Sequence, residues 1–137
     1  EAELLPLCRD QGLGVIPYNP LAGGFLTGKY RTLEDLPAGT RFTLGKTGEL
    51  YRERYWHEAQ LHAVARMRAF FEPRGKKLAA VAVAWMLRQP GITAPILGAS
   101  RPEQLDDVLA AVDLPLDEEE LAFCDQLWYD LPRRAGK

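Results

Sequence analysis

Apolar residues recur at helical spacing in five stretches of the chain, which predicts five amphipathic helices. Glycine or proline marks where the first three end: Gly12 follows the first helix, Pro73 the second and Pro90 the third. Pro102 is well placed as the first residue of the fourth helix. The predicted helices lie over residues 4–8, 61–71, 78–85 and 102–109 and after residue 117.

The last of these helices has the clearest beginning. Asp117 can cap it, and Glu120 stands three residues on, as in a capping box. Leu116 and Leu121 have the spacing of a hydrophobic staple. We interpret the acidic run 118–120 as charge that complements the positive end of the helix dipole, rather than as a general-acid pair.

Two short apolar runs, Val15–Tyr18 and Ala94–Gly98, are predicted to be β-strands. Between them, Pro20–Gly48 is rich in glycine and proline and is predicted to be one long loop. Helical crossovers separate the strands, so we expect parallel strands in an α/β fold. Parallel strands are buried on both faces, so the runs around Ile16 and Ile96 need neighbouring strands that this sequence does not contain. We expect the chain to be the end of a larger fold.

Both predicted strands run into turns of small residues at which a phosphate could bind. The first such segment is Gly14–Lys29, and Pro95–Gln104 repeats its design later in the chain. Small residues let the backbone approach a ligand closely, and free N–H groups at the next helix start favour negative charge. Two phosphate sites in one chain suggest a dinucleotide.

Composition narrows the classes of function. A chain of 137 residues that is 47% hydrophobic has the size and apolar content of a single soluble domain. The 17 basic and 19 acidic residues leave a net charge of −2, which argues against a nucleic-acid footprint. No apolar run approaches the roughly 18 residues of a membrane span, and the first residues lack the basic start of a secretory signal. We expect a cytoplasmic protein that binds neither nucleic acid nor membrane.

The metal-ligating residue types do not form a site in the sequence. Cys8 and Cys124 are not in a close metal spacing, and lone cysteines of this kind are usually buried thiols. His57 and His62 are five residues apart and do not share a helical face. We predict no metal site.

Four segments carry a resemblance to a known family: Tyr18–Lys29, Arg41-Phe42, Tyr51–Trp56 and Gly98–Gln104. They resemble the C-terminal part of an aldo-keto reductase, most closely the bacterial branch that also resembles potassium-channel β subunits. The resemblance implies that residues 1–137 are the C-terminal portion of a (β/α)₈ TIM barrel: helix 6, strand 7, two helices, strand 8 and the closing C-terminal helices. Barrel enzymes often build phosphate sites from the loops after strands 7 and 8, which agrees independently.

The resemblance also implies an NADPH site. Tyr18, at the end of strand 7, would stack its ring on the nicotinamide. The other implied cofactor residues are Asn19, Pro20, Leu21 and Gly23 under the pyrophosphate, Lys29 and Arg41 as positive charges, Gly98, Ser100 and Arg101 around the adenosine phosphate, and Gln104 and Asp107 near the adenine and its ribose. The family commonly has asparagine where this chain has Val108, so we expect one adenine hydrogen bond to be absent.

Arg101 is informative without the resemblance. It occupies the predicted cap position before Pro102, where an arginine cannot accept the N–H bond and a cation is unfavourable. A bound phosphate would relieve both penalties, and a 2′-phosphate there would favour NADPH over NADH. The alternative is an ordinary solvated arginine.

No catalytic residue is assigned within the chain. In the family that the chain resembles, a tyrosine assisted by lysine, aspartate and histidine on the first four strands donates the proton, and no segment here matches those strands. The implied parent enzyme reduces aldehydes or ketones to alcohols by hydride transfer, and this chain alone is expected to be inactive. Two other possibilities remain: an NADP(H)-binding regulatory module like the channel β subunits, or a degenerate fragment. The expected partners are a small carbonyl substrate in the complete protein, and the missing N-terminal half of the barrel or a second copy.

Overall fold

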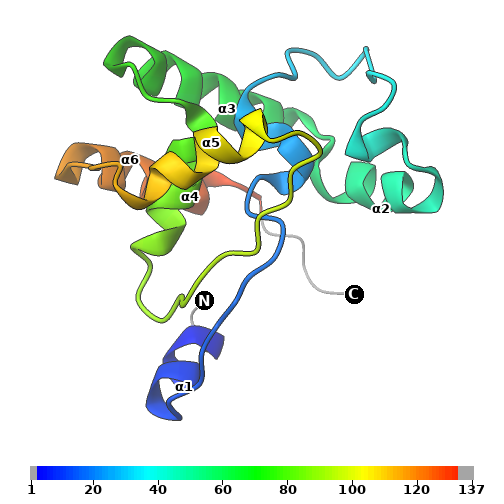
Figure 1. The fold of residues 1–137 in the computed structure, drawn as a ribbon. Helices are drawn as coiled ribbons and strands as arrows, with labels where there is room; N and C mark the ends of the chain where they lie inside the picture. The colour runs from blue at the N-terminus through cyan, green and yellow to red at the C-terminus, as the bar shows by residue number, and fades with distance from the viewer. Residues whose placement is uncertain (1–2, 133–137) are drawn as a thin grey trace.

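The computed structural model describes residues 3–132 as a set of helices joined by two extended segments (Figure 1). Helices α3 to α6 gather in one body, α2 lies to one side, and α1 lies apart at the end of the extended segments. The α-helices are α1 (Leu4–Asp10), α2 (Gly45–Tyr55), α3 (Glu58–Phe71), α4 (Leu78–Leu87), α5 (Glu103–Leu109) and α6 (Glu118–Asp130). Short 3₁₀ helices are η1 (Ala22–Thr27), η2 (Arg41–Thr43), η3 (Glu72–Arg74) and η4 (Ala110–Val112).

Helix α4 forms the centre of the core. Every residue from Leu78 to Ala84 is buried, so the helix is covered on all sides. Val64 and Met67 of α3 and Leu127 of α6 belong to the same buried cluster. The helical body is therefore organised around one apolar helix.

The structure confirms the five predicted helices, with small differences at their ends. Asp117 caps α6 as predicted: its carboxylate accepts a hydrogen bond from the backbone N–H of Glu120 at 2.9 Å, and the Glu120 side chain accepts from the N–H of Asp117 at 2.9 Å. Pro102 was predicted to be the first residue of α5, but it is the cap residue, and the helix begins one residue later at Glu103.

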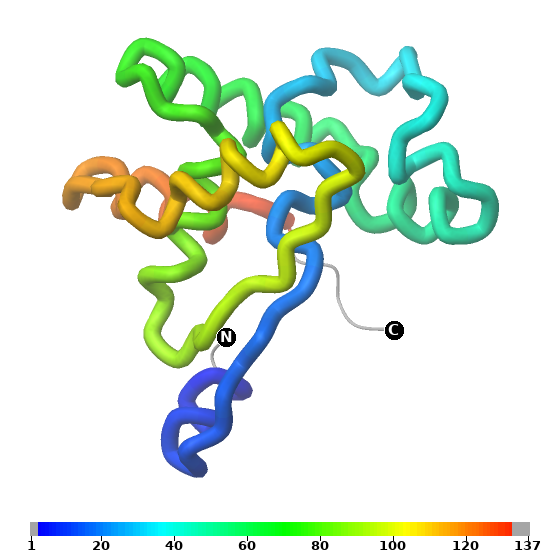
Figure 2. Tube along the Cα trace, in the orientation of Figure 1, coloured from blue at the N-terminus to red at the C-terminus, as the bar shows by residue number. Residues whose placement is uncertain are grey.

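The two strands are predicted wrongly as continuous elements, although their parallel direction is confirmed. Within residues 3–132 the extended segments pair through two isolated bridges, Val15 with Ile92 and Tyr18 with Ile96. The bridges enclose one more residue on the second segment than on the first, so the register slips by one. Pro17 and Pro95 also lack the N–H that a ladder requires. Figure 2 shows the two segments running side by side.

The prediction of one long loop over Pro20–Gly48 is also wrong, because η1, η2 and the start of α2 lie within it. Aromatic packing orders this segment: the Phe42 ring lies 5.6 Å from the Phe25 ring and 4.8 Å from the Trp56 ring, centroid to centroid. Gly48 brings α2 against this cluster, since a Cβ there would lie 2.6 Å from the Phe42 carbonyl oxygen. This segment is therefore ordered by contacts between residues far apart in sequence, and not by the secondary-structure propensity of its own residues.

The acidic run at the start of α6 is divided between two environments. Glu118 and Glu119 are exposed, in keeping with charge at the helix N-terminus, whereas Glu120 is only 1% exposed. The Lys76 ammonium donates to the Glu120 carboxylate at 2.6 Å and to the carbonyl of Pro115 at 2.7 Å. This buried pair ties the segment between α3 and α4 to the start of α6.

We predict that Lys76→Met destabilises the protein by about 3–5 kcal/mol, because it leaves the buried Glu120 carboxylate without its cation. Lys77→Met is the matched control: Lys77 pairs with Asp107 at the surface, where such a pair contributes about 0–1 kcal/mol. Urea denaturation of both variants measures the difference. Equal losses would contradict the structural role given to the buried pair.

Candidate cofactor site and the neighbouring pocket

The turn that follows the first extended segment is built on left-handed backbone. Asn19 has φ 62° and Ala22 has φ 50°, and Gly23 and Gly24 have φ 69° and 96°. Residues other than glycine rarely adopt this conformation, and such positions concentrate at binding sites. The Asn19 side chain stabilises the turn, because its Oδ1 accepts a hydrogen bond from the Gly23 N–H at 2.9 Å.

The last residues of α2 contact this turn. The Tyr55 hydroxyl accepts a hydrogen bond from Asn19 Nδ2 at 2.9 Å, and Arg54 donates to the Tyr18 hydroxyl at 3.3 Å. The hydrogen bond to Tyr18 is the largest cause that raises the pKa of Arg54. Arg54 and Tyr55 lie in the Tyr51–Trp56 segment of the family resemblance, but no local pattern assigns them a role, since only the fold brings α2 back to the turn.

The second turn begins at the same edge as the first. The bridge between Tyr18 and Ile96 is parallel, so the chain leaves both residues in the same direction. Gly98, Ser100, Arg101 and Gln104 all follow Ile96 and are exposed. Gln104 Oε1 accepts hydrogen bonds from the Ser100 N–H at 2.9 Å and its hydroxyl at 3.2 Å, which closes this turn.

All three predicted phosphate-binding cations lie at the surface. Lys29, Arg41 and Arg101 are exposed, and none of them forms an ion pair with a carboxylate within residues 3–132. Lys29 Nζ lies 5.0 Å from the Tyr30 ring centroid, and the Arg41 guanidinium lies 5.5 Å from that of Tyr51. Both cations therefore rest on aromatic faces and keep their charge available to an anion.

The remaining predicted residues are placed as follows. Pro20 is buried and Leu21 is half-buried beneath the first turn. Asp107 lies on α5 and pairs with Lys77 rather than standing free. The prediction that Arg101 caps α5 is wrong, because Pro102 is the cap residue and Arg101 precedes it.

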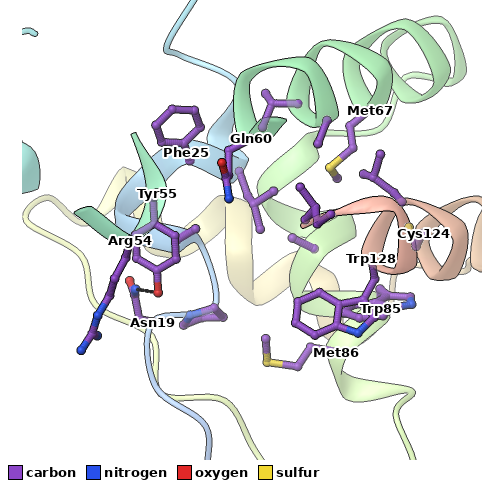
Figure 3. Close-up of a pocket in the computed structure, with 18 of the residues that line it drawn as sticks. Asn19, Phe25, Arg54, Tyr55, Gln60, Met67, Trp85, Met86, Cys124 and Trp128 are labelled. Carbon is purple, nitrogen blue, oxygen red and sulfur yellow. Dashed lines mark hydrogen bonds between the residues drawn. The ribbon is translucent and has the colours of Figure 1, made fainter. Parts of the chain in front are cut away.

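A cavity of about 420 Å³ lies behind the first turn and was not predicted (Figure 3). Its lining is mostly apolar. Asn19 and Tyr55 face each other on one side of it, and Trp85 and Trp128 lie on the other. Cys124 also lines the cavity, and burial raises the pKa of its thiol to about 12, so this cysteine stays protonated at neutral pH.

The histidines and cysteines do not converge. His57 Nε2 lies 2.7 Å from the carbonyl oxygen of Glu53, and His62 lies 3.7 Å from the Glu58 carboxylate at the surface. Cys8 is half-buried and Cys124 buried. In the part of the chain that the structure describes, no three potential metal ligands come together, and no helix combines the length and apolarity needed to cross a bilayer.

The profile of the Aldo/keto reductase family matches residues 1–129, nearly the whole chain. The chain belongs to the aldo/keto reductase family. Membership implies that the chain is part of a TIM barrel, although the described residues themselves form helices and isolated bridges.

Curated relatives agree with this membership. The chain is 40% identical to the uncharacterized oxidoreductase YrpG of Bacillus subtilis, over 93% of the chain and 36% of that protein. It is 38% identical to aflatoxin B1 aldehyde reductase member 2 of Mus musculus, over 93% of the chain and 38% of that protein. It is 34% identical to a probable voltage-gated potassium channel subunit beta of Arabidopsis thaliana, over 83% of the chain and 34% of that protein. The chain thus spans little more than a third of the length of these relatives.

We predict that Gly23→Ala lowers the free energy of unfolding by more than the cost of placing alanine at positive φ. A Cβ at Gly23 would lie 2.7 Å from Tyr51 Cδ1, in addition to the cost of about 1–2 kcal/mol for alanine with positive φ. Gly39→Ala is the matched control, because Gly39 has φ 72° and nothing within 4 Å of its Cβ position. The free energy of unfolding of both variants checks this. A loss at Gly23 no larger than at Gly39 would mean that Tyr51 moves aside freely.

Proposed function

We propose that the chain is the cofactor-binding C-terminal part of an NADPH-dependent aldo-keto reductase that reduces aldehydes or ketones to alcohols. The observation that carries the proposal is the parallel bridge between Tyr18 and Ile96, because it starts both small-residue turns at one edge. Exposed cations that form no ion pair with a carboxylate of residues 3–132 flank these turns, as a ligand with several phosphates requires. Family membership and relatives named as oxidoreductases support the class of reaction.

The residues present fit a dinucleotide. Tyr18 is 65% exposed, so its ring offers a flat face on which a nicotinamide can stack. A Cβ at Gly24 would lie 3.5 Å from Lys29 Nζ, so this glycine lets a cation lie beside the turn where a pyrophosphate would bind. Arg101 would hold the adenosine 2′-phosphate, with Ser100 beside it. When bound, NADPH supplies the hydride, and these residues bind and orient it.

In this proposal the proton donor comes from outside residues 1–137. No tyrosine of the chain is assigned this role, so we place the donor on strands that complete the barrel. Ile16, Tyr18 and Ile96 are 60%, 65% and 55% exposed. Ile16 and Tyr18 share one face of their segment, and Ile96 pairs beside Tyr18, so apolar side chains are exposed beside this bridge and can be covered by the rest of a barrel.

A second candidate is an NADP(H)-binding regulatory module without turnover. The 34% identity to a protein named as a channel subunit beta favours it. The two candidates share the cofactor site and differ only in the missing strands. Those strands carry a tyrosine, lysine, aspartate and histidine in the enzyme and lack them in the module.

The experiment that tests the proposed reaction compares two proteins. The 137-residue chain alone should not oxidise NADPH with any aldehyde, whereas the chain joined to the strands that complete its barrel should do so. Loss of absorbance of the reduced nicotinamide measures turnover, with contamination excluded by intact mass. Turnover by the chain alone would contradict the placement of the proton donor. A completed barrel that binds NADPH without turnover would favour the regulatory module.

Arg101→Ala should weaken NADPH binding to the completed barrel by about 1.5–3 kcal/mol, the range for hydrogen bonds to charged groups. NADH binding should change much less, because NADH has no 2′-phosphate. Titration of the same variant with both cofactors supplies the internal control. Equal losses for the two cofactors would show that Arg101 does not recognise the 2′-phosphate, and Ser100 or Arg41 would become the better candidate.

A further inference from the structure

Two consecutive residues at the end of α2 contact two consecutive residues at the proposed cofactor turn. Arg54 donates to the hydroxyl of Tyr18. The hydroxyl of Tyr55 bonds the side-chain amide of Asn19, as the dashed line in Figure 3 shows. The contacts join segments that are 36 residues apart. Neither Arg54 nor Tyr55 is among the residues assigned to the cofactor.

The amide of Asn19 is used at both ends. Its nitrogen donates to the Tyr55 hydroxyl at 2.9 Å, and its oxygen accepts from the Gly23 N–H at 2.9 Å. A planar amide with both ends bound has a single orientation. The backbone of Asn19 is left-handed, with φ 62°, so the turn depends on side-chain bonds to hold a conformation that few residues adopt.

The partner of Asn19 is itself held firmly. Trp56, the next residue after Tyr55, donates from Nε1 to the carbonyl of Leu33 at 3.1 Å. The Trp56 ring packs against Phe42 at 4.8 Å and against Phe25 at 5.4 Å, centroid to centroid. The aromatic cluster therefore anchors the end of α2, so the Tyr55 hydroxyl has a defined position from which it bonds Asn19.

We infer that Tyr55 is a positioning residue for the cofactor: through Asn19 it holds the turn in the conformation that receives the pyrophosphate. Arg54 makes the second contact and restrains the Tyr18 ring. The inference rests on the proposed function, because it concerns how that same site is held. Loss of the Tyr55 hydroxyl would leave Asn19 Nδ2 without this acceptor and free the amide to turn.

The test is a double-mutant cycle of Tyr55→Phe and Asn19→Gly, read as the NADPH dissociation constant of the completed barrel. Tyr55→Phe removes only the hydroxyl, and Asn19→Gly removes the amide while permitting positive φ. We expect Tyr55→Phe to raise the dissociation constant about three- to tenfold, as for loss of one hydrogen bond. In the Asn19→Gly background the same change should have no further effect, because Tyr55 acts through Asn19.

Tyr51→Phe is the matched control. Tyr51 lies one turn earlier on α2, and its hydroxyl does not bond Asn19, so its removal should change the dissociation constant less than twofold. Thermal unfolding of every variant identifies a general loss of structure. A lower unfolding temperature for Tyr55→Phe with unchanged NADPH affinity would overturn the inference, and so would effects of the two changes that simply add. A folded parent barrel that binds neither NADPH nor NADH would reject the proposed function and the inference with it.

Discussion

The burial of helix α4 is the constraint on which the rest of the structure depends. From Leu78 to Ala84 the helix offers no polar side chain to solvent, so every side of it has to be covered by another part of the chain. Helices α3 and α6 and the segment around Phe25 contribute to the same buried cluster. The Lys76–Glu120 pair joins the residues just before α4 to the first turn of α6. Because the Glu120 carboxylate is buried, loss of its cation is costly, which holds the start of α6 beside the residues that precede α4.

The aromatic cluster around Phe42 has the corresponding role for the candidate site. Phe25 lies in η1, directly after the turn, and Trp56 follows α2. Their packing on Phe42 brings the end of α2 to the turn that holds Asn19. The long excursion between Lys29 and Leu44 can therefore be understood physically: it carries the Phe42 ring and lets α2 return to the place where the chain leaves its first extended segment.

The two extended segments lead into the two turns of the candidate site. One parallel bridge aligns the ends of both segments, while the slip in register and the prolines keep them from forming a regular ladder alone. Their apolar residues remain exposed at Ile16 and Ile96. A parallel pair of this kind is stable when neighbours cover both its faces, which is the geometry of a barrel wall.

The sequence by itself determined the family and every α-helix of residues 3–132 except α2. Periodicity and end signals located α1, α3, α4, α5 and α6, because these patterns act within a few residues, and the capping box at Asp117 specified the start of α6. The sequence also indicated two small-residue turns, whose motifs lie within continuous segments.

Only the tertiary structure decided the rest. Helix α2 is polar overall and Gly48 is its one buried residue, so its order comes from contact with Phe42 rather than from burial of an apolar face of its own. Arg54 and Tyr55 reach Tyr18 and Asn19 across 36 residues, which no local pattern can encode. Within residues 3–132 the extended segments pair only through isolated bridges, since a strand depends on its neighbours whereas a helix satisfies its own hydrogen bonds.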